Sequence, residues 1–418
     1  CKQNTNGDFV LPVYSAPNNI LGWITRRREA TPKYLFSKHF KKSVSSILAY
    51  QDREILQVGH HKCHAANAFF SSNFNKSLII TMDGGGREES CAESIVGKPT
   101  SNTIWFGDNN KIYPLDMGFN EAPRESIGQV WTRYTKLVFG LSVGYPYGHS
   151  AGTVMAMAAL GDSDIYIDSM KQDIWGFVEH IQSLGNFSEP VKFNIAAALQ
   201  RWTEDIIKQK VEISIKMYEE AVGETPEYLC LAGGVSLNSV VVGKMFDWFN
   251  FKDISVVVTP HDGGLTIGAC QYLYHHVLEN SRIEWKDNFS PYLGEKYDEK
   301  NIWLEIDKAS DKISYKIVDD DIVIDLLDKQ NIISVFGGGS ESGRRALGNR
   351  SILADPRSKN MKDMINEKVK HRQWFRPFAP SILREDVKDW FDMDINSPYM
   401  SVVRKFKEEV KDLSLIHI

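Results

Sequence analysis

Residues Val58 to Gly86 read VGHHKCHAANAFFSSNFNKSLIITMDGGG, and this stretch predicts both a fold class and a site. Within it, His60 and His64 are four residues apart, so a helix would present both imidazoles on one face. The apolar run Ser77–Met82 predicts a buried strand whose C-terminal end carries Asp83 into the same space. Two histidines and a carboxylate suit iron, zinc or manganese. The stretch therefore predicts an α/β arrangement that holds a divalent metal ion.

Each part of this pattern has a plainer interpretation. Histidines at helical spacing are often solvated or bonded to a carbonyl, and the spacing by itself is weak evidence. A strand-terminal aspartate followed by three glycines strengthens the case, because glycines let backbone N–H groups approach a phosphate closely. Cys63 lies between the two histidines, but its helical angle points it partly away, so we expect it to pack in the core.

The composition bounds the class of protein. With 418 residues, 42% of them hydrophobic, the chain can bury a large core in two or three domains. No apolar run reaches the roughly 18 residues that a membrane span needs, and the start does not resemble a signal peptide. A net charge of −5 provides no electrostatic footprint for nucleic acid. Five scattered cysteines argue against a disulfide framework and favour a reducing cytoplasm. A homodimer is compatible with these features.

Both ends of the chain look artificial. The chain opens on Cys1, from which we expect an N-terminal piece to be missing. The last residues, Leu413–Ile418, read LSLIHI, which corresponds to a translated sequencing adapter, so they are excluded from the predicted fold.

Hydrophobic periodicity predicts alternating strands and helices. The predicted strands are Ser77–Met82, Ser94–Val96, Thr103–Phe106, Lys111–Pro114, Tyr228–Ala232, Ile254–Val258 and Ile332–Phe336. The predicted helices include Phe36–Gln51, Asn194–Val222, stopped at Gly223, and Ile267–Leu278.

Two further strand ends carry the pattern of the first. After Tyr228–Ala232, the glycines Gly233 and Gly234 turn the chain into a helix, an arrangement that exposes N–H groups to a nucleotide phosphate. After Ile254–Val258 comes TPHDGGLTIGA, which places Asp262 before two glycines. Any Asp-Gly turn would look similar, yet Asp262 is the natural fourth ligand for the set of His60, His64 and Asp83.

A basic segment follows the predicted strand Ile332–Phe336. It reads GGGSESGRRALGNRSILADPRS and, shortly after, KVKHRQWFRPFAPSIL. Arginine forks match phosphate and carboxylate geometry, so the segment predicts a pocket for an anionic small molecule. A nucleic-acid surface is the competing interpretation. Interleaved apolar residues and glycines disfavour it, because they indicate a folded pocket with close backbone approach.

Six segments, taken in order, resemble the NodU/CmcH-type O-carbamoyltransferases that decorate nodulation factors and antibiotics. They are HHKCHAA, MDGGG, LAGGVSLN, PHDGGLTIGA, ALGNRSILADPR and FRPFAPS, and the resemblance runs from about Gly59 to Met400. It implies an actin-like ATPase (ASKHA) domain in residues 1–280, related to the tRNA threonylcarbamoyl transferase. A linker at 281–301 and an incomplete YrdC-like α/β domain at 302–412 would follow. The implied reaction makes carbamoyl-adenylate from carbamoyl phosphate and ATP, and passes the carbamoyl group to a small-molecule hydroxyl.

The resemblance also implies roles for individual residues. The implied iron(II) ligands, which would also suit zinc or manganese, are His60, His64, Asp83 and Asp262, with His60 also catalytic. The positions implied to hold the nucleotide are Gly85, Gly233, Gly234 and Asn238. The positions implied to handle carbamoyl phosphate and ATP are Arg345, Asn349, Arg350, Ser351, Lys370, Arg372 and Arg376, of which the arginines 345, 350 and 376 are counted as catalytic.

Departures from the family pattern leave alternatives open. Thr153 stands where the family has a lysine, and Arg344 stands where it has a proline. These changes keep a non-catalytic nucleotide-binding protein of the actin-like superfamily as one alternative. A zinc metallopeptidase is the other, although His61 occupies the position of the glutamate in HExxH. We expect these 418 residues alone to be inactive, and the sequence does not identify the acceptor.

Overall fold

The computed structural model has a mixed α/β fold and describes residues 11–14, 55–88, 98–118, 126–143, 150–185 and 187–413. The chain divides into two compact units, Cys1–Phe289 and Ser290–Ile418. The predicted helix Phe36–Gln51 and the predicted strand Ser94–Val96 lie outside the described residues.

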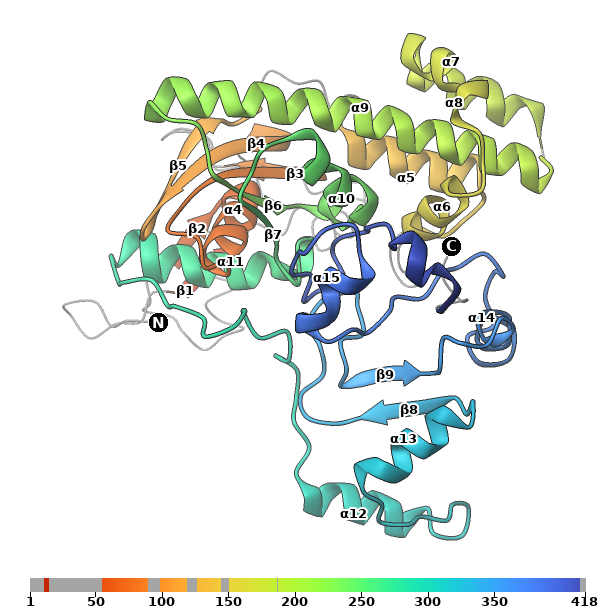
Figure 1. Ribbon diagram of the computed structural model, residues 1–418. Coiled ribbons are helices and arrows are strands. Elements are labelled where there is room, and N and C mark those ends of the chain that lie inside the picture. The colour runs from red at the N-terminus through yellow and green to blue at the C-terminus, as the bar shows by residue number, and fades with distance from the viewer. Residues whose placement is uncertain are drawn as a thin grey trace, which may run out of the picture. The chain divides into compact units, whose positions relative to one another are not determined.

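The first unit is built on a mixed five-stranded sheet with strand order β5-β4-β3-β6-β7 (Figure 1). Its strands are β3 (Lys76–Glu88), β4 (Lys98–Asp108), β5 (Lys111–Asp116), β6 (Tyr228–Ala232) and β7 (Asp253–Val256). β3, β6 and β7 run parallel, whereas β4 and β5 pair antiparallel. A separate parallel pair joins β1 (Leu11–Tyr14) to β2 (Ile55–Val58). Parallel strands end at the same edge of a sheet, so the segments that follow β6 and β7 emerge together.

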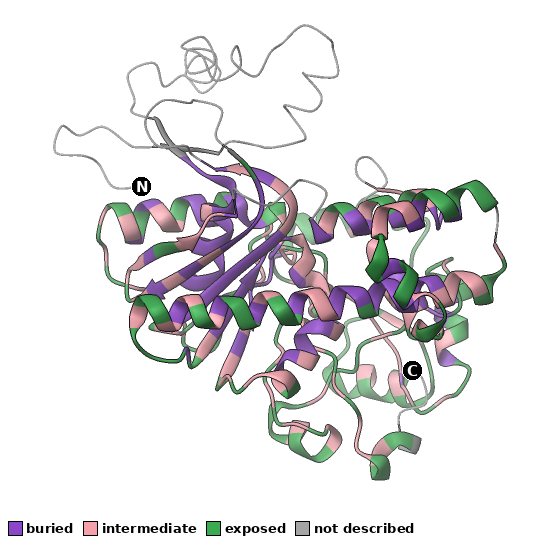
Figure 2. Cartoon of the chain, turned by 90° about the horizontal axis from the view of Figure 1, so that it is seen from above, coloured by how far each residue is buried: buried purple, intermediate pink, exposed green. Residues whose placement is uncertain are grey.

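Helices cover both faces of this sheet (Figure 1). On one face, Ile79, Trp105 and Cys230 pack against Phe69 of α4 (His60–Phe70). On the other face, the Phe106 ring meets Tyr218 of α9 at a centroid distance of 6.2 Å. β6 and the first half of β3, in the middle of the sheet, are therefore buried on both sides, as the purple ribbons of Figure 2 show. This burial is why their sequences are nearly continuously apolar rather than alternating.

The long helix α9 spans Glu189–Val222, beginning five residues before the predicted start. Pro190 lies in its first turn, where a missing N–H costs nothing. Gly223 ends the helix with φ of 82°, the left-handed conformation that glycine adopts easily. The predicted stop at Gly223 is confirmed.

The other helices of the first unit cover the sheet or connect its strands. They are α5 (Ile127–Leu137), α6 (Ala151–Ala158), α7 (Ile167–Gln172), α8 (Ile174–Leu184), α10 (Ser239–Trp248) and α11 (Leu265–Gln271), which continues as a π-helix over Tyr272–Val277. α11 lies against α4, where Cys63 packs with Leu265 and Ala269. The expectation that Cys63 is a core residue is confirmed.

β3 corrects one prediction. The strand does not end at Met82 but continues through the three glycines to Glu88, because β4 pairs with it again beyond the glycines. The register shifts between Met82 and Gly86, so this part of the ladder is irregular. Asp83 therefore lies within a bulged strand rather than at the end of one.

The second unit has a two-stranded antiparallel sheet of β8 (Ile333–Phe336) and β9 (Arg350–Leu353). Its helices are α12 (Glu299–Lys308), α13 (Asp320–Asp328), α14 (Met361–Met364) and α15 (Val387–Trp390). Met361 and Ile365 form a small core with Phe378 against it. The predicted strand at Ile332–Phe336 is confirmed to within one residue.

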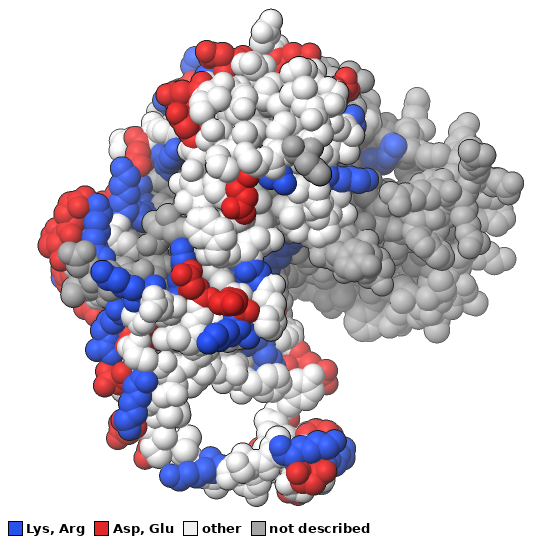
Figure 3. Space-filling view, turned by 90° about the vertical axis from the view of Figure 1, so that its right-hand side faces the viewer, with Lys and Arg blue, Asp and Glu red and all other residues white. Residues whose placement is uncertain are grey.

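Charged side chains of both signs lie near one another on the protein surface, as in the face drawn in Figure 3. Lys171–Asp205 and Arg201–Asp164 are two such ion pairs, with N–O distances of 2.6 and 3.0 Å. Among the described residues, no helix combines the length and the apolar character that crossing a membrane requires.

Candidate metal centre

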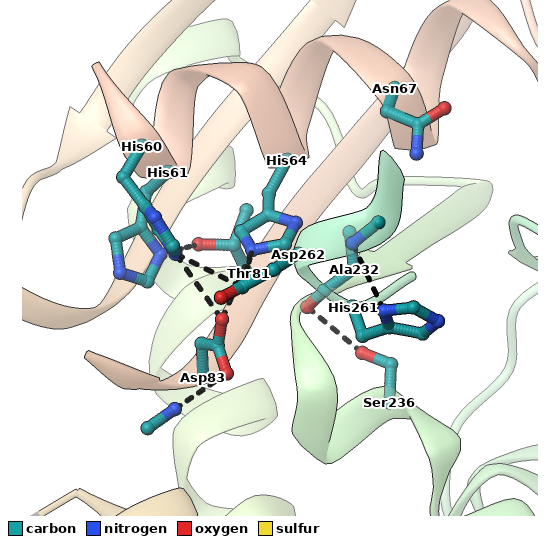
Figure 4. A network of polar contacts seen from close by, with 12 residues as sticks. His60, His61, His64, Asn67, Thr81, Asp83, Ala232, Ser236, His261 and Asp262 are labelled. Atoms are coloured by element: carbon teal, nitrogen blue, oxygen red, sulfur yellow. Dashed lines mark hydrogen bonds and ion pairs between the residues drawn. The ribbon is translucent and has the colours of Figure 1, made fainter. Parts of the chain in front are cut away.

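The first turns of α4 carry two histidines whose rings converge on Asp83 (Figure 4). His60 Nε2 lies 3.2 Å from Asp83 Oδ2, and His64 Nε2 lies 3.1 Å from the same oxygen. The other carboxylate oxygen, Oδ1, accepts the N–H of Gly84 at 2.6 Å. This bond fixes the carboxylate so that Oδ2 faces both imidazoles, as the helical spacing and the strand predicted.

Asp262 is the fourth residue of the group, and it comes from the segment that follows β7. It begins a short 3₁₀ turn after β7, and its Oδ1 lies 3.7 Å from His60 Nε2 and 3.6 Å from His64 Nε2. The four donor atoms all lie within 4.8 Å of one another. Ligand atoms held about 2.1 Å from one ion are separated by about 3.0 to 3.4 Å in octahedral or tetrahedral sites. The donors, two nitrogens and two oxygens, therefore fit a divalent transition metal in type; the distances from Asp83 to the histidines also match this spacing, whereas those from Asp262 are a few tenths of an ångström longer.

The site has buried polar side chains on the inside and is exposed to solvent on the side of Asp262. The side chains of His60 and His64 are fully buried and that of Asp83 is 16% exposed, whereas that of Asp262 is 52% exposed. Burial alone would lower the pKa of His64, but the carboxylates of Asp262 and Asp83 raise it to about 9. Burial would raise the pKa of Asp83, yet the two histidines hold it well below its usual range. The centre thus attracts positive charge, with access from the Asp262 side.

His61 lies between the two ligands in sequence but is directed away from the centre (Figure 4). Its Nε2 donates to the carbonyl of Thr100 at 3.2 Å, and its Nδ1 accepts from the Thr81 hydroxyl at 2.6 Å. Burial, together with the neighbouring His60 and His64, holds its pKa well below the usual value. His61 is therefore a neutral imidazole that joins α4 to β3 and β4. The position of His61 in the sequence, between the candidate ligands His60 and His64, does not reveal this role.

The glycines predicted to receive a nucleotide also meet structural demands. Gly233 has φ of 89°, and a Cβ there would lie 2.0 Å from the carbonyl oxygen of Met82. Its N–H donates to the carbonyl of Pro260 at 2.6 Å. A Cβ at Gly234 would lie 3.0 Å from Asp83 Oδ1, so this turn borders the metal centre. Gly85 is half-buried, with φ of 148°.

Asn238, the fourth predicted nucleotide residue, has partners within the fold. Its side chain accepts the N–H of Val241 at 3.3 Å, which caps α10. Its amide donates to Gln200 Oε1 on α9 at 2.8 Å. This amide therefore ties the start of α10 to α9.

In the second unit, three of the predicted arginines repel one another. Burial lowers the pKa of Arg345, Arg372 and Arg376. Neighbouring cations lower each further: Arg344 acts on Arg345, Arg345 acts on Arg376, and Arg376 acts on Arg372, whose pKa falls to about 10. Half-buried cations that depress each other's pKa form a site where an anion would be stabilising.

The other residues of this unit that are predicted to bind ligands mostly form hydrogen bonds with the loop between β8 and β9. Arg350 donates to the carbonyls of Gly337 and Asn349, and its guanidinium lies 3.7 Å from the Phe336 ring centroid. Asn349 donates to the carbonyl of Gly339 at 2.7 Å. Ser351 accepts the N–H of Gly348 at 2.9 Å, and Lys370 is exposed. Arg372 also has partners within the fold, since it donates to Asn366 Oδ1 at 2.7 Å and to the carbonyl of Pro377 at 3.2 Å, so Arg350 and Arg372 both help to hold their own loops.

Two carbamoyltransferase family models match separate parts of the chain. The Carbamoyltransferase N-terminus model matches residues 167–271, which include Asp262, and the Carbamoyltransferase C-terminus model matches residues 324–417, which include the basic segment. Nodulation protein NolO of Bradyrhizobium diazoefficiens is 30% identical over 84% of this chain and 63% of its own length. The 3'-hydroxymethylcephem-O-carbamoyltransferase of Amycolatopsis lactamdurans is 26% identical over 84% of this chain and 67% of its own.

The chain is shorter than these relatives. It spans 59% and 65% of two further relatives that are 30% identical to it. Among solved structures, HypF from T. kodakarensis has a TM-score of 0.36 and 16% identity, covering 57% of this chain and 39% of that one. That score is too low to indicate a shared fold, whereas the two family models and the relatives agree. The chain belongs to the carbamoyltransferase family.

Proposed function

We propose that the protein moves a carbamoyl group from carbamoyl phosphate to a hydroxyl of a small molecule, by way of a carbamoyl-adenylate made with ATP. The observation that carries the proposal is the convergence of four metal-ligating donors within 4.8 Å in a chain of the carbamoyltransferase family. A hydroxyl acceptor is supported by the name of one relative, which specifies a hydroxymethyl group.

The proposal assigns a task to each part of the chain. Residues 1–280 are an actin-like ATPase (ASKHA) domain for transfer, and 302–412 are a YrdC-like domain that forms the adenylate. Residues 281–301 link them, and the first part of this linker, up to Phe289, packs with the first unit. The glycine turn after β6 supports the first assignment, because Gly234 borders Asp83. The arginine group supports the second, because adenylate formation brings several negative charges together.

The two steps balance as follows. In the first, carbamoyl phosphate and one water give carbamate and inorganic phosphate. A carbamate oxygen then attacks the α-phosphorus of ATP, and pyrophosphate leaves. In the second, the acceptor oxygen bonds to the carbamoyl carbon, the bond from that carbon to the AMP oxygen breaks, and the hydroxyl proton passes to solvent. After that single hydrolysis, the carbamate and the carbamoyl-adenylate need protection from bulk water, since both decompose in it.

The residues of the metal centre have separate roles in this proposal. His60 and His64 would bind an iron(II) ion through Nε2, with zinc or manganese as alternatives, and Asp83 would bind through Oδ2. When bound, the ion would polarise the carbamoyl carbonyl as a Lewis acid. Asp262, the most exposed ligand, would lie where the substrates enter.

In the second unit, Arg345, Arg372 and Arg376 would bind phosphate oxygens. A bound phosphate would offset the repulsion between these neighbouring cations, which lowers their pKa values. Arg350 would hold the loop in place, because its guanidinium already bonds to two carbonyls.

Two alternatives make different predictions. A zinc metallopeptidase needs a base beside its histidines, but the residue at that position, His61, is turned toward Thr81 and Thr100. A non-catalytic nucleotide-binding protein would bind ATP without forming an adenylate. The departures at Thr153 and Arg344 are the observation that keeps this second alternative open.

The test uses the complete gene product that contains this chain. We expect carbamoyl phosphate to be required for the exchange of labelled pyrophosphate into ATP. Arg376→Ala should reduce that exchange by about 100-fold or more, as expected for the loss of a charge-stabilising group. Arg384→Ala removes an exposed arginine paired with Asp394 and should have little effect. His64→Ala should leave the exchange intact and abolish transfer to the acceptor. Binding of ATP without any exchange would instead identify a binding protein.

A further inference from the structure

The helix that carries both histidines has no side-chain cap from a neighbouring residue at its N-terminus. α4 has Gly59 at its N-cap position, no acidic residue in its first turn and no basic residue in its last. Its terminal N–H and C=O groups are nonetheless buried and must be satisfied. At the C-terminus the hydroxyl of Ser72 donates to the carbonyl of Phe69 at 2.7 Å, and residues from distant parts of the chain supply further partners at both ends.

At the N-terminus the partner is Glu88, at the end of β3. Glu88 is 1% exposed, and its Oε1 accepts the backbone N–H of His61 and, at 3.1 Å, that of Lys62. A carboxylate at this end of a helix satisfies free donors and complements the helix dipole. Glu88 therefore acts as an N-cap supplied from 27 residues away along the chain.

At the C-terminus the partner is Arg282. It donates to the carbonyls of Phe69 at 2.8 Å and Ser72 at 2.6 Å, and its guanidinium lies 4.2 Å from the Phe69 ring centroid. Trp285 donates through Nε1 to the carbonyl of Phe70 at 3.2 Å. A cation at this end again complements the dipole, so α4 is held between opposite charges from other segments.

The C-terminal part of β3, from Asp83 to Glu88, lies against the first turn of α4. Asp83 faces His60 and His64, and a Cβ at Gly86 would lie 2.2 Å from the His60 ring. A Cβ at Gly59 would lie 1.9 Å from Glu88 Oε2. Both glycines thus leave space for this contact. One short segment supplies both a candidate metal ligand and the group that anchors the helix bearing two others.

We propose that Glu88 is a positioning residue of the metal centre. By anchoring the N–H groups at the start of α4, it holds His60, the first residue of the helix, in the orientation that faces Asp83. Because a free helix end frays, loss of this anchor would let His60 move first, and His64 one turn later would follow less. The inference rests on the proposed metal centre.

Cobalt(II) alone is the probe, and its visible absorption on binding reports both affinity and ligand geometry. Groups that support metal ligands typically change affinity about 10- to 100-fold when removed, and we expect that loss for Glu88→Ala in the full chain. Glu88→Gln keeps an acceptor oxygen but loses the charge, so it should lose only about 2- to 5-fold. Arg282→Gln is the matched control, because it weakens the opposite end of the same helix and should leave cobalt affinity within about 2-fold.

A second comparison separates positioning from general destabilisation. Gly59→Ala would displace the Glu88 carboxylate, so by itself it should weaken cobalt binding about as much as Glu88→Ala does. In the Glu88→Ala background the same change should add less than about 2-fold, since nothing remains to displace. Losses that multiply would overturn the proposal.

The outcomes distinguish this inference from the function on which it rests. Wild-type chain that binds no cobalt would overturn the metal centre itself. Wild-type chain that binds cobalt, with Glu88→Ala binding equally well and showing the same spectrum, would overturn only the role of Glu88. Equal losses in Glu88→Ala and Arg282→Gln would also overturn it, because any weakening of α4 would then suffice.

Discussion

The two carboxylates of the proposed metal centre should contribute unequally to metal affinity. Asp83 Oδ2 lies 3.1 to 3.2 Å from both histidine nitrogens, and its side chain is 16% exposed. Asp262 Oδ1 lies 3.6 to 3.7 Å from the same nitrogens, and its side chain is 52% exposed. If Asp262 is removed, water can reach the vacated position and serve as a ligand, as it does in open metal sites. Asp83 is enclosed, so its replacement by alanine leaves a position that water fills less easily.

The magnitudes follow from this difference. We expect Asp262→Ala to weaken metal binding about 10-fold, or about 1.4 kcal/mol, which is the difference between a carboxylate and a water ligand at an exposed position. We expect Asp83→Ala to weaken it at least about 100-fold, or about 2.8 kcal/mol, because a buried charge close to both histidines is lost.

The assay is a competition titration of each variant with cobalt(II) against a chromophoric chelator. Denaturant unfolding of each metal-free variant is measured alongside, so that a folding defect is recognised. Similar unfolding curves with an Asp262→Ala loss equal to or greater than that of Asp83→Ala would refute the reasoning from exposure.

Three other predictions concern the fold and its ligands. Gly233→Ala should lower the free energy of unfolding by more than about 2 kcal/mol, since the new Cβ would overlap the Met82 carbonyl. As a control, Gly140→Ala should lower it by only about 1 kcal/mol, because Gly140 has φ of 65° but open space around it. Equal losses in denaturant titrations would contradict this difference. Cys270 is exposed and should be alkylated readily at pH 8. Burial raises the pKa of Cys230 to about 11, so in the native protein its alkylation, followed by mass spectrometry, should be detected only as the pH approaches that value. Equal alkylation rates for the two cysteines would contradict this burial. Saturating cobalt(II), at about 100 times its Kd, should stabilise the first unit by about 2.7 kcal/mol and raise its Tm, and a Tm unchanged by both cobalt and chelator would count against the metal centre.

Several elements could be predicted from sequence because their signals are local. The strand Tyr228–Ala232 was predicted with the bounds that it has, and the end of α9 was placed at Gly223. Periodicity and a helix-stopping glycine depend on neighbours within a few residues. The histidine spacing likewise needed only the helical repeat to place His60 and His64 on one face.

Other features depended on pairing between distant segments. β3 was predicted to end at Met82, but β4 pairs with it beyond the glycines and extends it to Glu88. The arginine segment predicted an anion site as a whole, yet Arg350 bonds to Gly337 and Asn349 within its own loop. Sequence shows that a guanidinium is present but not which carbonyls come within its reach.

The sequence by itself determined which side chains could bind a metal ion and which backbone segments would carry them, because helix repeat, strand alternation and glycine stops act over a few residues. Only the tertiary structure decided that Asp83 and Asp262 meet at one point, since that depends on β6 lying between β3 and β7. It also decided that Glu88 and Arg282 cap α4. Those contacts join residues 27 and 213 positions apart, and such separations leave no periodic trace in the chain.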